Sequence, residues 1–105
     1  MLKTPFIVAL SLIAIPALSS ANEPSSLQTG EKLYKSACIA CHGTGAAGAP
    51  RFGNKQEWAP YLSQGLDQMV DVAMHGKGAM PARGGTKADD ATLRAAVEYM
   101  ASRAK

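Results

Sequence analysis

The chain has 105 residues, 11 basic and 8 acidic side chains, and a formal net charge of +3. This length is enough for one domain, and so weak and scattered a charge argues against a nucleic-acid-binding protein. The two cysteines cannot complete a zinc site of four sulfur ligands.

Residues 1–21 have the layout of a secretory signal peptide. Lys3 precedes an apolar stretch over residues 5–18, and small residues at positions 19–21 predict cleavage between Ala21 and Asn22. The alternative is an uncleaved membrane anchor, but this stretch is interrupted by a proline and is shorter than the about 20 residues that span a bilayer. We therefore predict one secreted domain over residues 22–105 in the periplasm, with at most peripheral membrane association.

A first helix is expected to begin near Ser25 or Ser26, because Ser25 and Gln28 resemble a capping box. Its apolar or small positions are Leu27, Gly30, Leu33, Tyr34, Ala37, Cys38 and Cys41. Gly30 weakens a helix by about 1 kcal/mol relative to alanine. We interpret it as a point where another helix approaches closely, and an ordinary tolerated glycine is the alternative.

Residues 38–42 read Cys38-Ile39-Ala40-Cys41-His42, the signature of covalent haem attachment. Side chains three apart on a helix share a face, so both sulfurs can reach the two vinyl groups along one porphyrin edge. His42 is then placed to reach the iron. The alternatives are a redox or structural disulfide and half of a zinc site. A thiol–disulfide oxidoreductase usually carries a βαβ pattern, which this sequence lacks.

The segment 43–48 contains only glycine, alanine and threonine. Small side chains and free backbone torsions would let it lie close against a flat ligand. A flexible linker is the alternative. Its position directly after His42 favours the first interpretation.

A short second helix is predicted over Lys55–Ser63, with Asn54 as its cap and Pro60 as a shortening or kinking residue. Trp58, the only tryptophan, is expected in the core. If it is buried, its indole N–H needs a partner, which a haem propionate would supply.

The third predicted helix, about Leu66–His75, decides which side chain is the second iron ligand. Its apolar stripe is Leu66, Met69, Val70, Ala73 and Met74, so both methionines are most simply core residues. His75 lies opposite the centre of the stripe and faces solvent. Met80 follows a glycine-rich turn and precedes Pro81, so it is expected to be exposed in an extended loop with no helical packing role. Because a thioether is a good ligand for haem iron, we predict Met80 at the sixth position, with an open site as the alternative.

A final helix is predicted from Lys87 or Asp89 to Ser102, capped by Thr86 with Asp89 or by Asp89 directly. Its buried stripe is Leu93, Ala96, Val97, Met100, Ala101 and Ala104. We expect this helix to pack on the first one, with Gly30 and Tyr34 against residues 97–100. We find no alternating strand pattern, so the predicted fold class is all-α.

The chain resembles small class I cytochromes c, most closely the bacterial cytochrome c5 family, over nearly all of residues 22–105. The residues that carry the resemblance are Gly30–Tyr34, Cys38–Gly43, Gly45–Phe52, Trp58–Pro60, Gly76, Met80-Pro81, Gly84-Gly85 and Val97–Met100. One departure concerns an extra cysteine pair that cytochromes c5 commonly carry just beyond the two glycines. Here Thr86-Lys87-Ala88-Asp89 takes its place, which leaves the rigidity of this loop and the exact subfamily open.

The resemblance implies four to five short helices wrapped around one covalently bound haem c. It implies thioether links from Cys38 and Cys41, and His42 and Met80 as axial ligands of the iron. It also implies that the Pro50 carbonyl accepts the other ring N–H of His42, and that Trp58 lies near a propionate.

The predicted function is that of a periplasmic one-electron carrier without substrate turnover of its own, which shuttles electrons between respiratory complexes. The expected partners are redox proteins such as membrane-bound oxidases or reductases. A small haem enzyme or gas sensor with a labile sixth ligand is the alternative. Six basic residues could form a mildly positive surface around a cofactor edge, or an ordinary solvated surface: Lys32, Lys35, Arg51, Lys55, Lys77 and Arg83.

Overall fold

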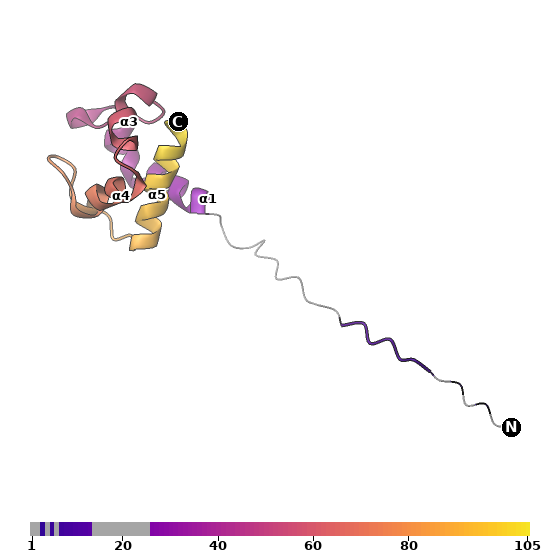
Figure 1. The fold of residues 1–105 in the computed structure, drawn as a ribbon. Helices are drawn as coiled ribbons and strands as arrows, with labels where there is room; N and C mark the ends of the chain where they lie inside the picture. The colour runs from indigo at the N-terminus through magenta and orange to yellow at the C-terminus, as the bar shows by residue number, and fades with distance from the viewer. Residues whose placement is uncertain (1–2, 4, 6, 14–25) are drawn as a thin grey trace.

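The computed structural model describes residues 3, 5, 7–13 and 26–105. The helical segments are α1 (Ser26–Leu33), a π-helix (Tyr34–Cys38), α2 (Ile39–His42), a 3₁₀ turn (Ala46–Gly48), α3 (Lys55–Leu62), α4 (Leu66–His75), a second 3₁₀ turn (Ala82–Gly85) and α5 (Asp90–Arg103) (Figure 1). Over the described residues there is no strand, only an isolated bridge between Lys77 and Met80. The prediction of an all-α fold is confirmed.

The N-terminal predictions fall mostly on residues that the structure does not describe. The cleavage point between Ala21 and Asn22 and the cap at Ser25 both lie outside the described ranges. Residues 7–13 form no helix or strand and are exposed. In the part of the chain that is described, no helix has the length and apolar character needed to cross a membrane.

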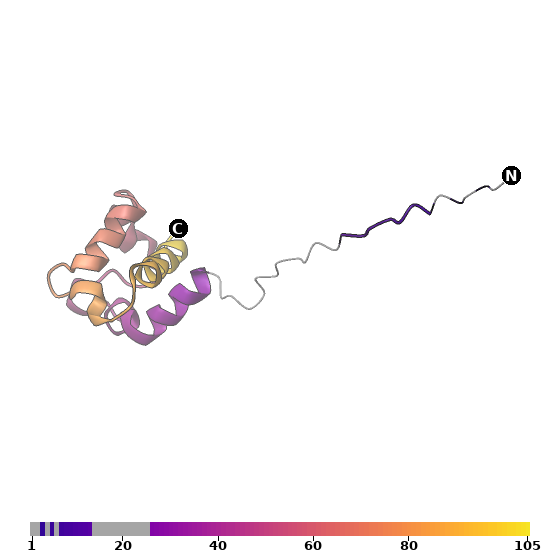
Figure 2. The same cartoon turned by 90° about the horizontal axis from the view of Figure 1, so that it is seen from below.

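The closest packing in the domain is between α1 and α5, which lie side by side in both views (Figures 1 and 2). Gly30 is buried at this contact, and a Cβ placed there would lie 2.0 Å from the Ala95 carbonyl oxygen. Only glycine allows the two backbones to come this close. The interpretation of Gly30 as a point of close approach is confirmed, although it meets Ala95 and Ala96 rather than residues 97–100.

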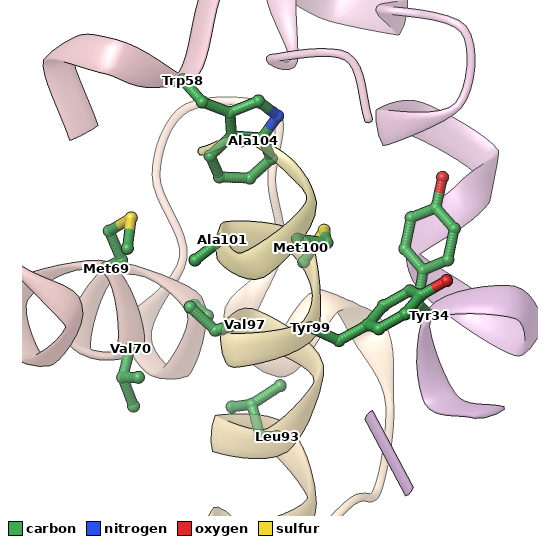
Figure 3. Packing of buried hydrophobic residues seen from close by; sticks show 11 residues of the cluster. Tyr34, Trp58, Met69, Val70, Leu93, Val97, Tyr99, Met100, Ala101 and Ala104 are labelled. Atoms are coloured by element: carbon green, nitrogen blue, oxygen red, sulfur yellow. The ribbon is translucent and has the colours of Figure 1, made fainter. Parts of the chain in front are cut away.

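The core forms around α5, which is buried on more than one face. All six residues of the predicted stripe are buried, and so are Ala95 and Tyr99. Figure 3 shows the reason: Met69 and Val70 of α4 lie on one side of α5, and Tyr34 lies on the other. A helix between two neighbours hides two faces, whereas the periodic stripe in the sequence reports only one.

The first predicted helix is not continuous. After Leu33 the chain winds as a π-helix over Tyr34–Cys38, and the Ile39 N–H donates to the Tyr34 carbonyl. A π turn adds a residue and so changes which face the following side chains occupy. Tyr34, where the π turn begins, is buried, while Leu27, predicted on the same apolar face, is 48% exposed.

Leu93 gives a direct test of this core. It is 3% exposed, so Leu93→Ala should lower the free energy of unfolding by about 2–5 kcal/mol, as for other buried leucines. Denaturant unfolding of the purified protein measures the loss, with Leu27→Ala as the matched surface control, expected within about 0.5 kcal/mol of wild type. Equal losses in the two variants would contradict the assignment of Leu93 to the core.

Candidate functional site

The two cysteines lie on either side of the junction between the π-helix and α2. Both are free thiols; Cys38 is half-buried at the edge of the core, and Cys41 is exposed. Burial raises the pKa of the Cys38 thiol. The attacking cysteine of a thiol–disulfide oxidoreductase needs the opposite shift. This pKa direction disfavours the redox-disulfide alternative.

His42 is the buried polar residue of the core, at 8% exposure. Its Nδ1 lies 2.9 Å from the carbonyl oxygen of Pro50, which is the contact that the resemblance implies. A carbonyl oxygen can only accept, so Nδ1 carries the proton and donates it, and Nε2 keeps its lone pair. The Phe52 N–H in turn donates to the His42 carbonyl at 2.6 Å. These two bonds join the ends of the segment between His42 and Phe52, and they fix the imidazole in one tautomer.

Trp58 on α3 contacts the same segment. The N-cap of α3 is Asn54, as predicted. The Trp58 ring is 5% exposed and lies 5.6 Å from the His42 ring, nearly parallel to it. Its Nε1–H donates to the Arg51 carbonyl at 2.8 Å. The structure therefore gives this N–H a backbone partner, and the position of Trp58 near a propionate stays a prediction. Trp58 fixes the peptide next to the one that orients His42.

Met80 lies in a tight hairpin and not in an extended loop. The Lys77 N–H donates to the Met80 carbonyl at 2.9 Å, and the Met80 N–H donates to the Lys77 carbonyl at 3.0 Å. The turn between them contains Gly78 in the left-handed region, at φ 58°. Met80 is half-buried and packs against the core, so its predicted exposure was wrong.

Two further contacts position this hairpin. A Cβ at Gly76 would lie 2.6 Å from the Met80 carbonyl oxygen, so the end of α4 touches the backbone of the hairpin directly. The Lys77 ammonium lies 5.9 Å from the centre of the Tyr61 ring on α3, within the range of a cation–π contact. In both overall views the hairpin and residues 39–48 lie on the same side of α5 (Figures 1 and 2).

The competing ligands on α4 lie where the sequence predicted. The His75 side chain is 74% exposed and its Nδ1 lies 3.1 Å from Asp71. Met69 is in the core at 9% exposure, and Met74 packs against the same cluster. Among the described residues, no three His, Cys, Asp or Glu side chains gather as ligands for a bare metal ion.

Much of the predicted basic surface is neutralised by neighbours. Lys35 pairs with Glu31 at 2.9 Å, Arg51 pairs with Glu57 at 2.8 Å, and Arg83 pairs with Asp90. The hydrogen bond with Glu31 raises the pKa of Lys35. These pairs favour an ordinary solvated surface over a positive patch.

Comparison with known proteins shows which family this chain is similar to. The family model described as cytochrome C oxidase, cbb3-type, subunit III, matches residues 25–100. The chain is 38% identical to cytochrome c-555 of Chlorobaculum tepidum over 104 residues, which cover 93% of this chain and 96% of that protein. It is 34% identical to cytochrome c5 of Ectopseudomonas mendocina over 85 residues, which cover 77% and 97%.

The structural comparison agrees with the sequence comparison. The fold matches a chain in the crystal structure of an electron transfer complex of nitrite reductase with cytochrome c, with a TM-score of 0.72 and 60% sequence identity. The match covers 73% of this chain and 95% of that chain.

Proposed function

Because the chain belongs to the class I c-type cytochromes, close to the cytochrome c5 family, we propose that it is a periplasmic one-electron carrier with His42 and Met80 as axial ligands. Members of this family bind covalently attached haem c. When bound, the haem supplies an iron that takes up and releases one electron. The role of the polypeptide is to hold the haem, to exclude water from it and to fix the two ligands of its iron.

The observation that carries the proposal is the state of His42. Its Nδ1–H donates to the Pro50 carbonyl, so Nε2 is the ring nitrogen that is left to bind the iron. A metal-bound histidine needs this arrangement, in which the outer hydrogen bond sets the tautomer and the ring orientation. The contact with the Trp58 ring and the bond from Trp58 to Arg51 support the same orientation.

The cysteines next to His42 fit covalent attachment. Cys38 and Cys41 are both free thiols, and each S–H can add across one vinyl double bond to leave a thioether. The residue type and spacing therefore suit one covalently held porphyrin.

Met80 supports an electron carrier more than an enzyme. Two backbone hydrogen bonds and the contact with Gly76 fix the backbone of the hairpin that carries Met80. If both axial positions are filled by protein, no site is left for a substrate on the iron. Methionine ligation also favours the ferrous state, which raises the reduction potential.

The location and the partner follow from different evidence. We propose that residues 1–21 are a signal peptide, on the pattern of Lys3, the apolar stretch and the small residues at 19–21. A cytochrome c of similar fold forms an electron transfer complex with nitrite reductase. We therefore propose a redox enzyme as partner, either a periplasmic reductase or a membrane-bound oxidase.

Met80→Ala tests the ligand assignment. The variant should lose the weak near-infrared band of a thioether–iron bond. Its midpoint potential should fall by on the order of 0.1 V, because axial ligands shift haem potentials over about 0.8 V. Met69→Leu is the matched control, because Met69 packs in the core, and it should keep the band. An unchanged band in Met80→Ala would place the ligand elsewhere, and ready carbon monoxide binding by the wild-type ferrous protein would favour a haem enzyme or gas sensor.

A further inference from the structure

We propose that Arg83 is a positioning residue for Met80, because it fastens the chain that follows Met80 to the beginning of α5. The proposal rests on the proposed function, in which Met80 is an axial ligand. It concerns a residue for which neither the motif nor the resemblance implies a role.

The backbone at Arg83 has a conformation that needs a cause. Arg83 has φ 58°, and the next two residues, Gly84 and Gly85, have φ 60° and 77°. Three consecutive residues are therefore in the left-handed region. Glycine adopts this region freely, whereas a residue with a Cβ is disfavoured there. Interactions of Arg83 would offset the cost of this conformation.

The Arg83 side chain and carbonyl supply these interactions. Its Nη1 donates to the Ala88 carbonyl at 2.9 Å, and its Nη2 donates to the Asp90 carboxylate. The Arg83 carbonyl accepts from both the N–H of Thr86, at 3.0 Å, and its hydroxyl, at 2.9 Å. The Thr86 hydroxyl also accepts from the Ala88 N–H at 3.2 Å. These bonds close the stretch from Arg83 to Asp90 into a clamp.

The clamp reaches Met80 through the two residues between Met80 and Arg83, Pro81 and Ala82. The Gly84 N–H donates to the Pro81 carbonyl at 3.0 Å. On the other side, a Cβ at Gly76 would lie 2.8 Å from the Ala82 nitrogen and 2.6 Å from the Met80 carbonyl oxygen. Residues 80–82 are therefore held between the end of α4 and the clamp. Without the Arg83 side chain, the bonds to the Ala88 carbonyl and the Asp90 carboxylate would be lost, while the backbone bonds of the turn and the contact with α4 would remain.

The effect is expected on ligand position more than on overall stability. The side chains of Arg83 and Asp90 are 37% and 69% exposed, and an ion pair this exposed contributes little to folding. The segment that Arg83 and Asp90 hold directly follows Met80, the proposed sixth ligand. Loosening the clamp should therefore raise the population in which the Met80 thioether has left the iron.

Arg83→Gly removes the side chain without strain, because glycine accepts the same φ, but it also frees the backbone at this position. Arg83→Lys keeps the Cβ and therefore controls for that freedom. In the purified ferric holoprotein, imidazole competes with the sixth ligand and serves as the probe. Apparent affinity rises in proportion to the population of the open state, so Arg83→Gly should bind imidazole about tenfold more tightly than wild type. The amide hydrogens of Lys77 and Met80, both bonded in the hairpin, should also exchange faster. Arg83→Lys keeps the positive charge but cannot donate the two guanidinium hydrogen bonds, so it should also bind imidazole more tightly than wild type.

Arg94→Gln is the matched control. Arg94 lies on α5 and, like Arg83, forms exposed ion pairs, with Asp67 at 2.9 Å and Glu98 at 3.3 Å, so its loss should leave imidazole affinity within about twofold of wild type. If both Arg83 variants behave like this control while Met80→Ala binds imidazole much more tightly, the role of Arg83 is wrong and the ligand assignment stands. If Met80→Ala and wild type bind imidazole equally, the proposed function itself fails.

Discussion

Replacing Gly30 with valine is expected to prevent α1 from docking on α5 and to remove much of the stability of the domain. A Cβ at Gly30 would lie 2.0 Å from the Ala95 carbonyl oxygen, 2.5 Å from the Ala95 carbonyl carbon and 3.0 Å from the Ala96 nitrogen. All three are backbone atoms of a helix, which cannot rotate aside as a side chain can. The two helices must separate, and the cost should exceed the about 1–3 kcal/mol that is typical of overpacked cores.

The loss should extend to the aromatic cluster one turn further along. The Tyr34 ring lies 4.6 Å from Phe52 and 5.6 Å from Tyr99, and the rings of Phe52 and Tyr99 are 5.5 Å apart. This cluster joins the π-helix, the segment after Pro50 and α5. If α1 shifts, the supports of both Cys38 and His42 shift with it.

Unfolding of the holoprotein by denaturant or heat measures the effect. Lys32→Val is the matched control, because it places the same β-branched side chain at an exposed position of α1 and should change stability by about 0.5 kcal/mol or less. Gly30→Ala should be intermediate, because alanine favours a helix by about 1 kcal/mol over glycine but still collides with α5. A Gly30→Val protein as stable as the Lys32→Val control would contradict the close contact.

The second large effect is expected for Cys38→Ala combined with Cys41→Ala. Without the two thiols no thioether can form, so denaturation should release all haem and the polypeptide should show only its bare mass. The domain should also lose most of its structure. A domain this small buries only about 60% of its unfolded surface and is marginally stable unaided, and residues 22–105 contain five aromatic side chains for a core.

Mass spectrometry and circular dichroism of the protein, produced in a host that matures c-type haem, measure these two effects separately. Ile39→Ala is the matched control, because Ile39 lies between the cysteines, is 45% exposed and supplies no sulfur; it should keep its haem. Haem retained after denaturation of the double variant would contradict covalent attachment through these residues. A well-folded haem-free double variant would show instead that the core is complete without the group.

Features encoded by neighbouring residues could be predicted from the sequence. The bounds of α4 agree with the prediction, Leu66–His75. Asn54 and Asp89 cap α3 and α5 through side-chain bonds to the N–H three residues later. A cap, an apolar stripe and an attachment motif each depend on spacing along one helix or turn, so the sequence contains the whole signal.

What the sequence alone determined was the Cys38–His42 motif and the all-α fold, and it favoured a close helix contact at Gly30. Only the tertiary structure decided that the first helix changes to a π turn at Tyr34, that Trp58 binds the Arg51 carbonyl and that Met80 lies in a half-buried hairpin. It also paired Arg83 with Asp90 across the loop before α5. The physical reason is that these features depend on which second segment lies opposite each residue. Periodicity along one segment shows which face is apolar, but not which backbone carbonyl or charge will meet that face after folding.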